Sequence, residues 1–214
     1  MIEVHPQHKP IHSIKEFLIH MLAITLGLMI ALGMEFGIIW HEHRSLAREA
    51  RTNIAAEMHT NQEELAHARD ALQIEDAELQ KVISFTRALR KDRRAPLPDV
   101  SLNIRLSNLN RSSWDTAAAM GALNYMKYSS VKGYEDVYTL QQDFENLQRQ
   151  RLQAWLALNA TISDQDATEA SDRQIDVVDQ QARLARASTR AAISVEESLD
   201  QLYTRTLATE SQRP

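Results

Sequence analysis

The stretch that most constrains this chain is a nearly uncharged apolar run close to its N-terminus. The twenty residues from Met21 to Trp40 contain one charged side chain, Glu35. At about 1.5 Å of rise per residue, a helix of this length spans the ~30 Å hydrocarbon core of a bilayer. Trp40 closes the run, and an indole ring favours the headgroup level. The run therefore predicts a transmembrane helix.

A capping pattern marks the start of this helix. Ser13 and Glu16 stand as S-x-x-E ahead of the apolar run, which predicts a first helical residue at Ile14. We assign the transmembrane helix to residues 13–40. Residues 1–12 hold two prolines and three histidines and are expected to form a short flexible tail.

Two stripes of small residues lie on different faces of the predicted helix. They consist of Ala23, Gly27 and Ala31, continued by Glu35, and of Gly33 and Gly37. Small residues let helix backbones approach closely in lipid, so either stripe could mediate association, although glycine is also common in membrane helices. For Glu35 we expect a position near the interface or an interhelical hydrogen bond rather than an ion or proton pathway.

The residues around the run bear on processing and orientation. No A-x-A cleavage site follows it, so we expect an uncleaved anchor rather than a signal peptide. Three positive groups flank each end: the α-amine, Lys9 and Lys15 on one side, and Arg44, Arg48 and Arg51 on the other. This equal count leaves the orientation open, and the expectation of a periplasmic C-terminal domain has no residue behind it.

Composition restricts the class of the remaining chain. It has no cysteine, which excludes disulfides, thiolate metal sites and a cysteine nucleophile. The net charge of −5 argues against a general nucleic-acid binder. No proline occurs between Pro10 and Pro96 or between Pro98 and Pro214. We therefore predict an all-α fold, in which the transmembrane helix continues into a long helix and an antiparallel helical bundle or coiled coil follows.

Residues 41–94 continue the helical pattern with heptad spacing. One column holds Met58, Leu65, Leu72 and Leu79, and the other holds Asn61, Ala68, Glu75, Val82 and Leu89. A buried asparagine such as Asn61 commonly sets register and oligomeric state at some cost in stability. Because the second column is polar, we expect the seam to mediate helix association and also to pack against later helices of the same chain.

The C-terminal half reads as a connection followed by further helices. Residues 95–111 are expected to cross the end of the bundle, and residues 112–214 to complete it. Within the latter, S-x-x-D patterns at Ser112 and Ser163 predict helix starts, and a middle helix is expected over residues 131–160 after a cap at Ser129 or Ser130. The last helix should end near Leu207. Its predicted stripe is Ile175, Val178, Ala182, Ala185, Ala192, Leu199 and Tyr203.

Several charged and histidine clusters allow more than one interpretation. His59, Glu63 and His67 share a helix face and could bind a metal, but a solvated face explains them equally well. The histidines of the tail, His5, His8 and His12, lack the spacing of a known site. Five cations could meet anionic lipid or stabilise the end of a helix before Pro96, and we favour the second reading. They are Arg87, Arg90, Lys91, Arg93 and Arg94.

Two segments resemble recurring blocks of a broad group of uncharacterised bacterial single-pass membrane proteins, which have an N-terminal transmembrane helix and a coiled-coil-like helical domain. The segments are ITLGLMIALGMEFGIIWHEHRSLAREARTNIAAEMHTNQEEL, with its I-A-L-x-x-E…W pattern, and SSWDTAAAMGALNYMKYSSVKGYEDVY, with W-x-T-A…G-A-L…Y. The resemblance implies a bacterial cytoplasmic membrane. It implies no activity and no site residues.

Known catalytic motifs are missing, since the sequence has no G-x-S-x-G, H-E-x-x-H, Walker or dinucleotide pattern. We therefore expect no enzyme, cofactor or nucleic-acid partner. The leading hypothesis is a membrane-anchored scaffold or accessory subunit that self-associates or binds another membrane protein. The alternative is a sensor-like protein with a ligand between bundle helices near Trp114, Tyr125 and Tyr128.

Overall fold

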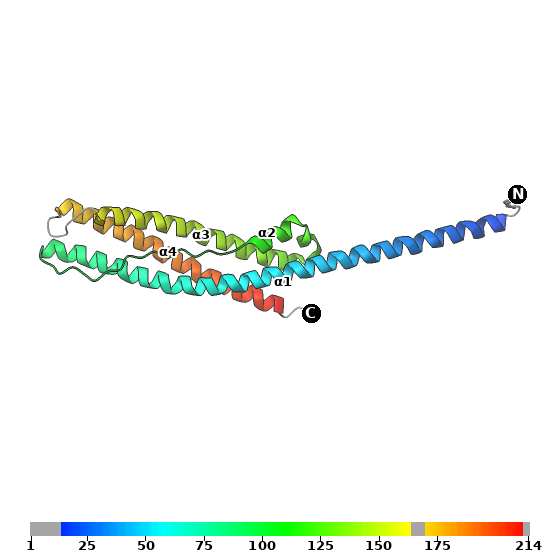
Figure 1. Cartoon of the computed structure of the whole chain (residues 1–214), viewed down its shortest axis with the longest axis horizontal. Coiled ribbons are helices and arrows are strands. Elements are labelled where there is room, and N and C mark those ends of the chain that lie inside the picture. Colours follow the sequence, from blue (N-terminus) through cyan, green and yellow to red (C-terminus); the bar gives the residue numbers. More distant parts are fainter. Residues whose placement is uncertain (1–13, 164–169, 212–214) are drawn as a thin grey trace, which may run out of the picture. The chain divides into compact units, whose positions relative to one another are not determined.

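A computed structural model describes residues 14–163 and 170–211, and within them it contains helices and no strand. This confirms the all-α prediction. The elements are α1 (Ile14–Lys91), α2 (Ser112–Ala119), the 3-10 helix η1 (Ala122–Tyr125), α3 (Tyr128–Ser163) and α4 (Asp172–Ser211) (Figure 1). The chain divides into two compact units, residues 1–48 and 49–214.

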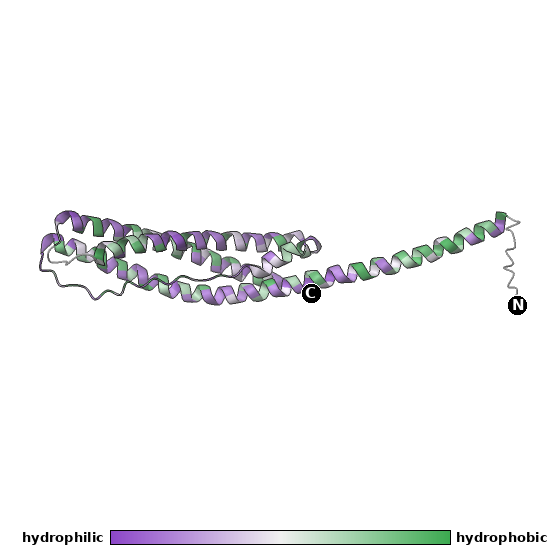
Figure 2. Cartoon of the chain, turned by 45° about the horizontal axis from the view of Figure 1, so that its top comes forward, coloured by the Kyte–Doolittle hydropathy of each residue, from purple (hydrophilic) through white to green (hydrophobic). Residues whose placement is uncertain are grey.

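The first unit contains the N-terminal part of α1. The structure describes this helix from Ile14 onward, and the predicted cap residue Ser13 lies outside the described residues. Figure 2 shows this part as predominantly hydrophobic, and its large apolar side chains are exposed around the helix. It is long and apolar enough to cross a membrane by length and composition, and none of the apolar window is buried. At its end the guanidinium of Arg44 lies 5.1 Å from the ring centroid of Trp40, a cation–π contact.

In the second unit, α4 runs antiparallel to the C-terminal part of α1. Their contacts follow reverse order along the two helices: Arg51 with Glu210, Arg69 with Glu196, Asp76 with Arg186, Thr86 with Asp179, and Arg90 with Asp176. The backbones of α3 and α4 also approach one another closely. The alanine-rich stripe of α4 explains this, because small side chains permit short interhelical distances.

The third helix, α3, runs parallel to α1, which the sequence analysis did not anticipate. The pairs Glu57 with Tyr138, Asn61 with Gln141, and Glu75 with Arg151 advance in the same direction along both helices. Two parallel helices require a connection that returns along the length of the bundle. Residues 92–111, here called the strap, supply that return.

The expectation that the connection crosses the end of the bundle is therefore wrong. The strap travels back beside α1 (Figure 1). Its contacts descend along α1 as the strap advances: Ser101 with Glu78, Arg105 with Glu64, and Asn110 with Asn61. The sequence pattern could not show this path, because extended chain has no helical periodicity and its partners lie far away in the sequence.

The heptad columns of α1 form the core of this unit. Met58, Leu65 and Leu79 are fully buried, Leu72 is 1% exposed, and Asn61 and Glu75 of the second column are buried too. The predicted stripe of α4 is also largely buried. The chain's own helices thus cover the seam that the sequence analysis assigned to helix association.

Element boundaries differ from the prediction where a tertiary contact replaces a local cap. Ser112 starts α2, but the backbone N–H of Ser113 in the first turn donates to the carboxylate of Glu57 on α1 at 2.8 Å, and no side chain of the N-cap residue is used. Gly121, with φ of 72°, ends α2 in the left-handed region that glycine tolerates.

Two further helix starts were misplaced. The predicted middle helix begins at Tyr128, so Ser129 and Ser130 lie inside its first turn rather than before it. Ser163 belongs to the end of α3, and the rest of its predicted box, 164–166, lies outside the described residues. The cap of α4 is Ser171, whose hydroxyl and backbone N–H both bond the side-chain oxygen of Gln174 at 2.6 and 2.7 Å.

Candidate functional site

Polar side chains occur at intervals along the bundle core and position the strap. The side-chain amide of Gln148 accepts from the backbone N–H of Ser107 at 2.6 Å and donates to its carbonyl at 3.0 Å. The side-chain amide of Asn61 likewise accepts from the backbone N–H of Asn110 at 2.7 Å and donates to its carbonyl at 2.6 Å. These amides take the place that a neighbouring strand would occupy, so the buried backbone of the strap is hydrogen-bonded without a sheet.

A buried ion pair forms a second polar layer. Arg151 is 2% exposed and its guanidinium lies 3.4 Å from the carboxylate of Glu75. The same guanidinium donates to the backbone carbonyl of Arg105 in the strap, and Thr189 donates to Glu75 at 2.6 Å. Burial raises the pKa of Glu75, although Thr189 and Arg151 oppose the shift. Burial also lowers the pKa of Arg151.

Two buried polar residues of α4, Thr189 and Glu196, were missing from its predicted stripe. They are fully buried, and Glu196 pairs with Arg69 at 2.8 Å. The signal was present in the sequence, because both stand at seven-residue intervals between Ala182 and Tyr203. Their polarity hid them from a search for apolar positions. A heptad count that ignored residue type would have found them.

A third polar layer joins α1, α3 and α2. The hydroxyl of Tyr138 donates to Glu57 at 2.6 Å, and Trp114 stacks on the Tyr138 ring with centroids 5.5 Å apart. Burial, followed by the hydrogen bond to Glu57, raises the pKa of Tyr138 and keeps it a donor. Donors are matched to acceptors here, so the arrangement aligns helices rather than presenting a reactive group to a substrate.

The three aromatic residues that the sensor hypothesis assigned to a ligand site do not line a common site between bundle helices. Trp114 packs against Tyr134 and Tyr138 of α3, while Tyr125 and Tyr128 are 47% and 82% exposed. An apolar cavity of about 440 Å³ lies instead where α1 ends, α4 begins and the strap starts. Its lining comes from α1, the strap and the adjoining ends of α3 and α4.

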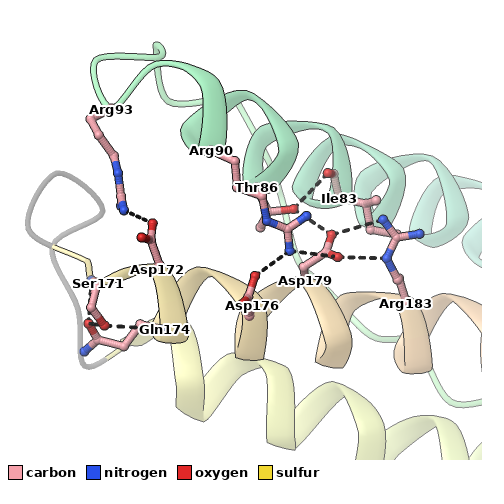
Figure 3. Close-up of polar contacts among 10 residues, drawn as sticks. All are labelled: Ile83, Thr86, Arg90, Arg93, Ser171, Asp172, Gln174, Asp176, Asp179 and Arg183. Carbon is pink, nitrogen blue, oxygen red and sulfur yellow. Dashed lines mark hydrogen bonds and ion pairs between the residues drawn. The ribbon is translucent and has the colours of Figure 1, made fainter.

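An ion-pair cluster stands next to that cavity (Figure 3). Arg90 pairs with Asp176 at 2.7 Å, and Arg93 pairs with Asp172. The remaining cations of the predicted basic group, Arg87, Lys91 and Arg94, are exposed and form no ion pair with residues that the structure describes. Since α1 ends at Lys91, the cations do lie at a helix C-terminus, where the dipole favours them.

At the centre of this cluster Asp179 joins α1 to α4. Its carboxylate accepts from Thr86 at 2.8 Å and from Arg183 at 2.9 Å, and its side chain is 10% exposed. Burial alone would raise the pKa of Asp179, but the hydrogen bonds from Arg183 and Thr86 outweigh it and the pKa is lowered. The ionised form is therefore stabilised in the folded protein.

Replacing Asp179 by asparagine is expected to lower the free energy of unfolding at pH 7 by about 1 kcal/mol, at the modest end for charged hydrogen bonds because Arg183 is half exposed. Because the pKa of Asp179 is below the ordinary 3.8 in the folded protein, its carboxylate contributes stability when the pH is above 3.8. This contribution is lost as the pH falls through the folded-state pKa. The difference between the two proteins should thus close in acid.

Denaturant unfolding of the full chain in detergent, at pH 7 and at about pH 2, measures this difference. The matched control is Asp176→Asn, whose side chain is 66% exposed and which should change stability little at either pH. A difference between wild type and Asp179→Asn that is the same at both pH values would contradict the assignment.

The residues predicted to mediate helix association in a membrane all lie on the exposed part of α1. Ala23, Gly27, Ala31, Gly33, Glu35 and Gly37 are exposed, and a Cβ added to any of the three glycines would meet nothing within 4 Å. The chain's own packing therefore gives no reason for glycine at these positions.

The metal hypotheses gain no support from the geometry. His59, Glu63 and His67 are exposed on α1, and no group of three potential ligands converges among the residues that the structure describes. The tail histidines, His5, His8 and His12, lie outside the described residues.

Comparisons with protein-family models, with curated proteins and with solved structures found no match.

Proposed function

We propose that this protein is a single-pass membrane-anchored helical scaffold or accessory subunit, which associates with copies of itself or with another membrane protein through its membrane helix. The observation that carries the proposal is a contrast within the chain. The bundle covers its own apolar seam, whereas the apolar segment of α1 around residues 14–40 exposes its large side chains on every face. No catalytic or cofactor role forms part of the proposal.

The exposed apolar surface supports the proposal that this segment lies in a lipid bilayer. A core helix of a soluble protein would be mostly buried, and the apolar window of α1 is not buried at all. A cleaved signal sequence would carry a small-residue cleavage site, but His41, Glu42, His43 and Arg44 follow Trp40. The resemblance noted above favours the bacterial cytoplasmic membrane, and we place the bundle in the periplasm as a working assumption.

The glycines support association through this segment. Glycine lowers helix propensity. At these three positions no other part of the described chain packs into the space that the missing side chain leaves. Small residues in membrane helices allow a second backbone to approach, with van der Waals packing as the driving force. Glu35 continues the Gly27 stripe, and a hydrogen bond to a second helix would satisfy it.

The test is Gly27→Ile in the full chain. Because the added side chain has open space around it, the monomer should fold unchanged, while association should weaken about tenfold or more. Sedimentation analysis across a detergent dilution series measures this, with Leu28→Ile on a neighbouring face as the matched control.

The outcomes of this experiment are distinct. Unchanged mass for Gly27→Ile and for Gly33→Ile would exclude both stripes as the association surface. A wild-type chain that is monomeric and cross-links to nothing in native membranes would contradict the proposal as a whole.

A further inference from the structure

We propose that the cavity between α1, the strap, α3 and α4 binds one aliphatic chain of the kind carried by fatty acids and lipids. Its volume of about 440 Å³ falls within the range of small-molecule sites, about 300–1,000 Å³. Eleven of its fourteen lining residues are aliphatic, aromatic or proline, namely Val82, Phe85, Leu89, Leu97, Pro98, Val100, Leu102, Ile162, Ala170, Ile175 and Val178. The proposal does not depend on self-association of the membrane helix.

The polar side chains in the wall are already engaged. Thr86 donates to the carboxylate of Asp179, and Thr161 donates to the backbone carbonyl of Ala157 at 2.8 Å. The side-chain oxygen of Gln174 accepts from Ser171. A strongly polar ligand would lose its hydration here without gaining hydrogen bonds in return, so the wall selects an apolar occupant.

Two of the cations beside the cavity are neutralised in ion pairs. Arg90 and Arg93 are held by Asp176 and Asp172 across the gap between α1 and α4. The part of a ligand that enters the cavity therefore needs no charge to balance Arg90 or Arg93. A slender hydrocarbon chain satisfies this condition, and any polar headgroup would remain at the mouth in water.

The neighbouring sequence offers no large apolar side chain to fill the space. The segment between α3 and α4 that the structure leaves undescribed reads DQDATE, and Ala167 is its single apolar residue. An unfilled apolar cavity of this size weakens the packing around it and does not hold ordered water well. A hydrocarbon chain would restore those contacts and at the same time join the strap to all three long helices.

The experiment uses the full chain in lipid nanodiscs and a photoreactive diazirine fatty acid. Cross-links are mapped by mass spectrometry. Labelling is expected in peptides covering residues 82–102 and 161–178, and excess unlabelled palmitic acid should reduce it about fivefold or more. Labelling of residues 14–40 by bulk lipid serves as the internal reference. A second arm with a diazirine phospholipid shows whether the chain is taken from a free acid or from a lipid.

A cavity-filling variant provides the decisive comparison. Val178→Trp should abolish labelling of the cavity wall and leave labelling of residues 14–40 unchanged. Val177→Trp, at the adjacent position that is 39% exposed, should label like the wild type. If circular dichroism shows that Val178→Trp is unfolded, Val100→Trp fills the cavity from the strap instead.

Labelling confined to residues 14–40 would overturn the proposal. Wall labelling that palmitic acid does not compete, or that survives in a folded cavity-filling variant, would do the same.

Discussion

Replacing Arg151 by methionine is expected to lower the free energy of unfolding at pH 7 by about 3–5 kcal/mol, the range for breaking a buried ion pair from one side. Arg151 and Glu75 are 2% and 5% exposed, and the variant would leave the carboxylate of Glu75 with Thr189 as its remaining donor. It would also remove the donor to the backbone carbonyl of Arg105, which helps to hold the strap.

The pH dependence of this loss has a definite sign. Burial raises the pKa of Glu75 above its ordinary 4.5 even with Arg151 present, and removing the cation should raise it further. A carboxyl whose pKa is raised on folding destabilises the protein as the pH rises from the unfolded to the folded pKa. The variant should therefore be closest to the wild type near pH 4 and furthest from it at neutral pH.

Denaturant unfolding of the full chain in detergent provides the measurement, and two variants control it. Arg149→Met, at an exposed position two residues away on α3, should change stability by less than about 0.5 kcal/mol. The double variant Glu75→Leu with Arg151→Met should recover most of the loss, since an apolar pair of similar size often equals a buried ion pair. A double variant no more stable than Arg151→Met would show that the pair is not what holds this layer.

Leu72→Asp should unfold the bundle. The free energy of unfolding should fall by more than about 4 kcal/mol, which approaches the whole stability of an ordinary domain. Leu72 is 1% exposed and belongs to the buried column that includes Leu65 and Leu79. An aspartate there would have to bury a charge or stay protonated. The control is Ile74→Asp, two residues along the same helix at a position that is 62% exposed, where little change is expected.

Leu72→Asp also distinguishes packing between chains from packing within one chain. If the Leu72 column served only an interface between chains, Leu72→Asp would lower the oligomer mass and leave a folded monomer. The intramolecular burial instead predicts loss of the near-ultraviolet circular dichroism signal in Leu72→Asp. Gly27→Ile should show the reverse pattern, with an intact signal and a lower mass.

The sequence alone determined the helical class, the place of the apolar segment and the burial of the heptad columns. Periodicity carries this information because a helix returns every seventh side chain to nearly the same face, so Leu65, Leu72 and Leu79 share a seam whatever they pack against. The apolar segment was recognisable because a run of about twenty residues with a single charge is long and apolar enough to span a bilayer.

Only the tertiary structure decided the parallel order of α1 and α3, the path of the strap and the position of the cavity. Each depends on side chains that meet from distant parts of the chain: Gln148 holds Ser107, Arg151 holds Arg105, and Glu57 caps α2. The cavity is a volume left between four segments, and no single segment encodes it. Local patterns specify which face of a helix is buried, whereas the identity of the partner follows from the packing of all elements together.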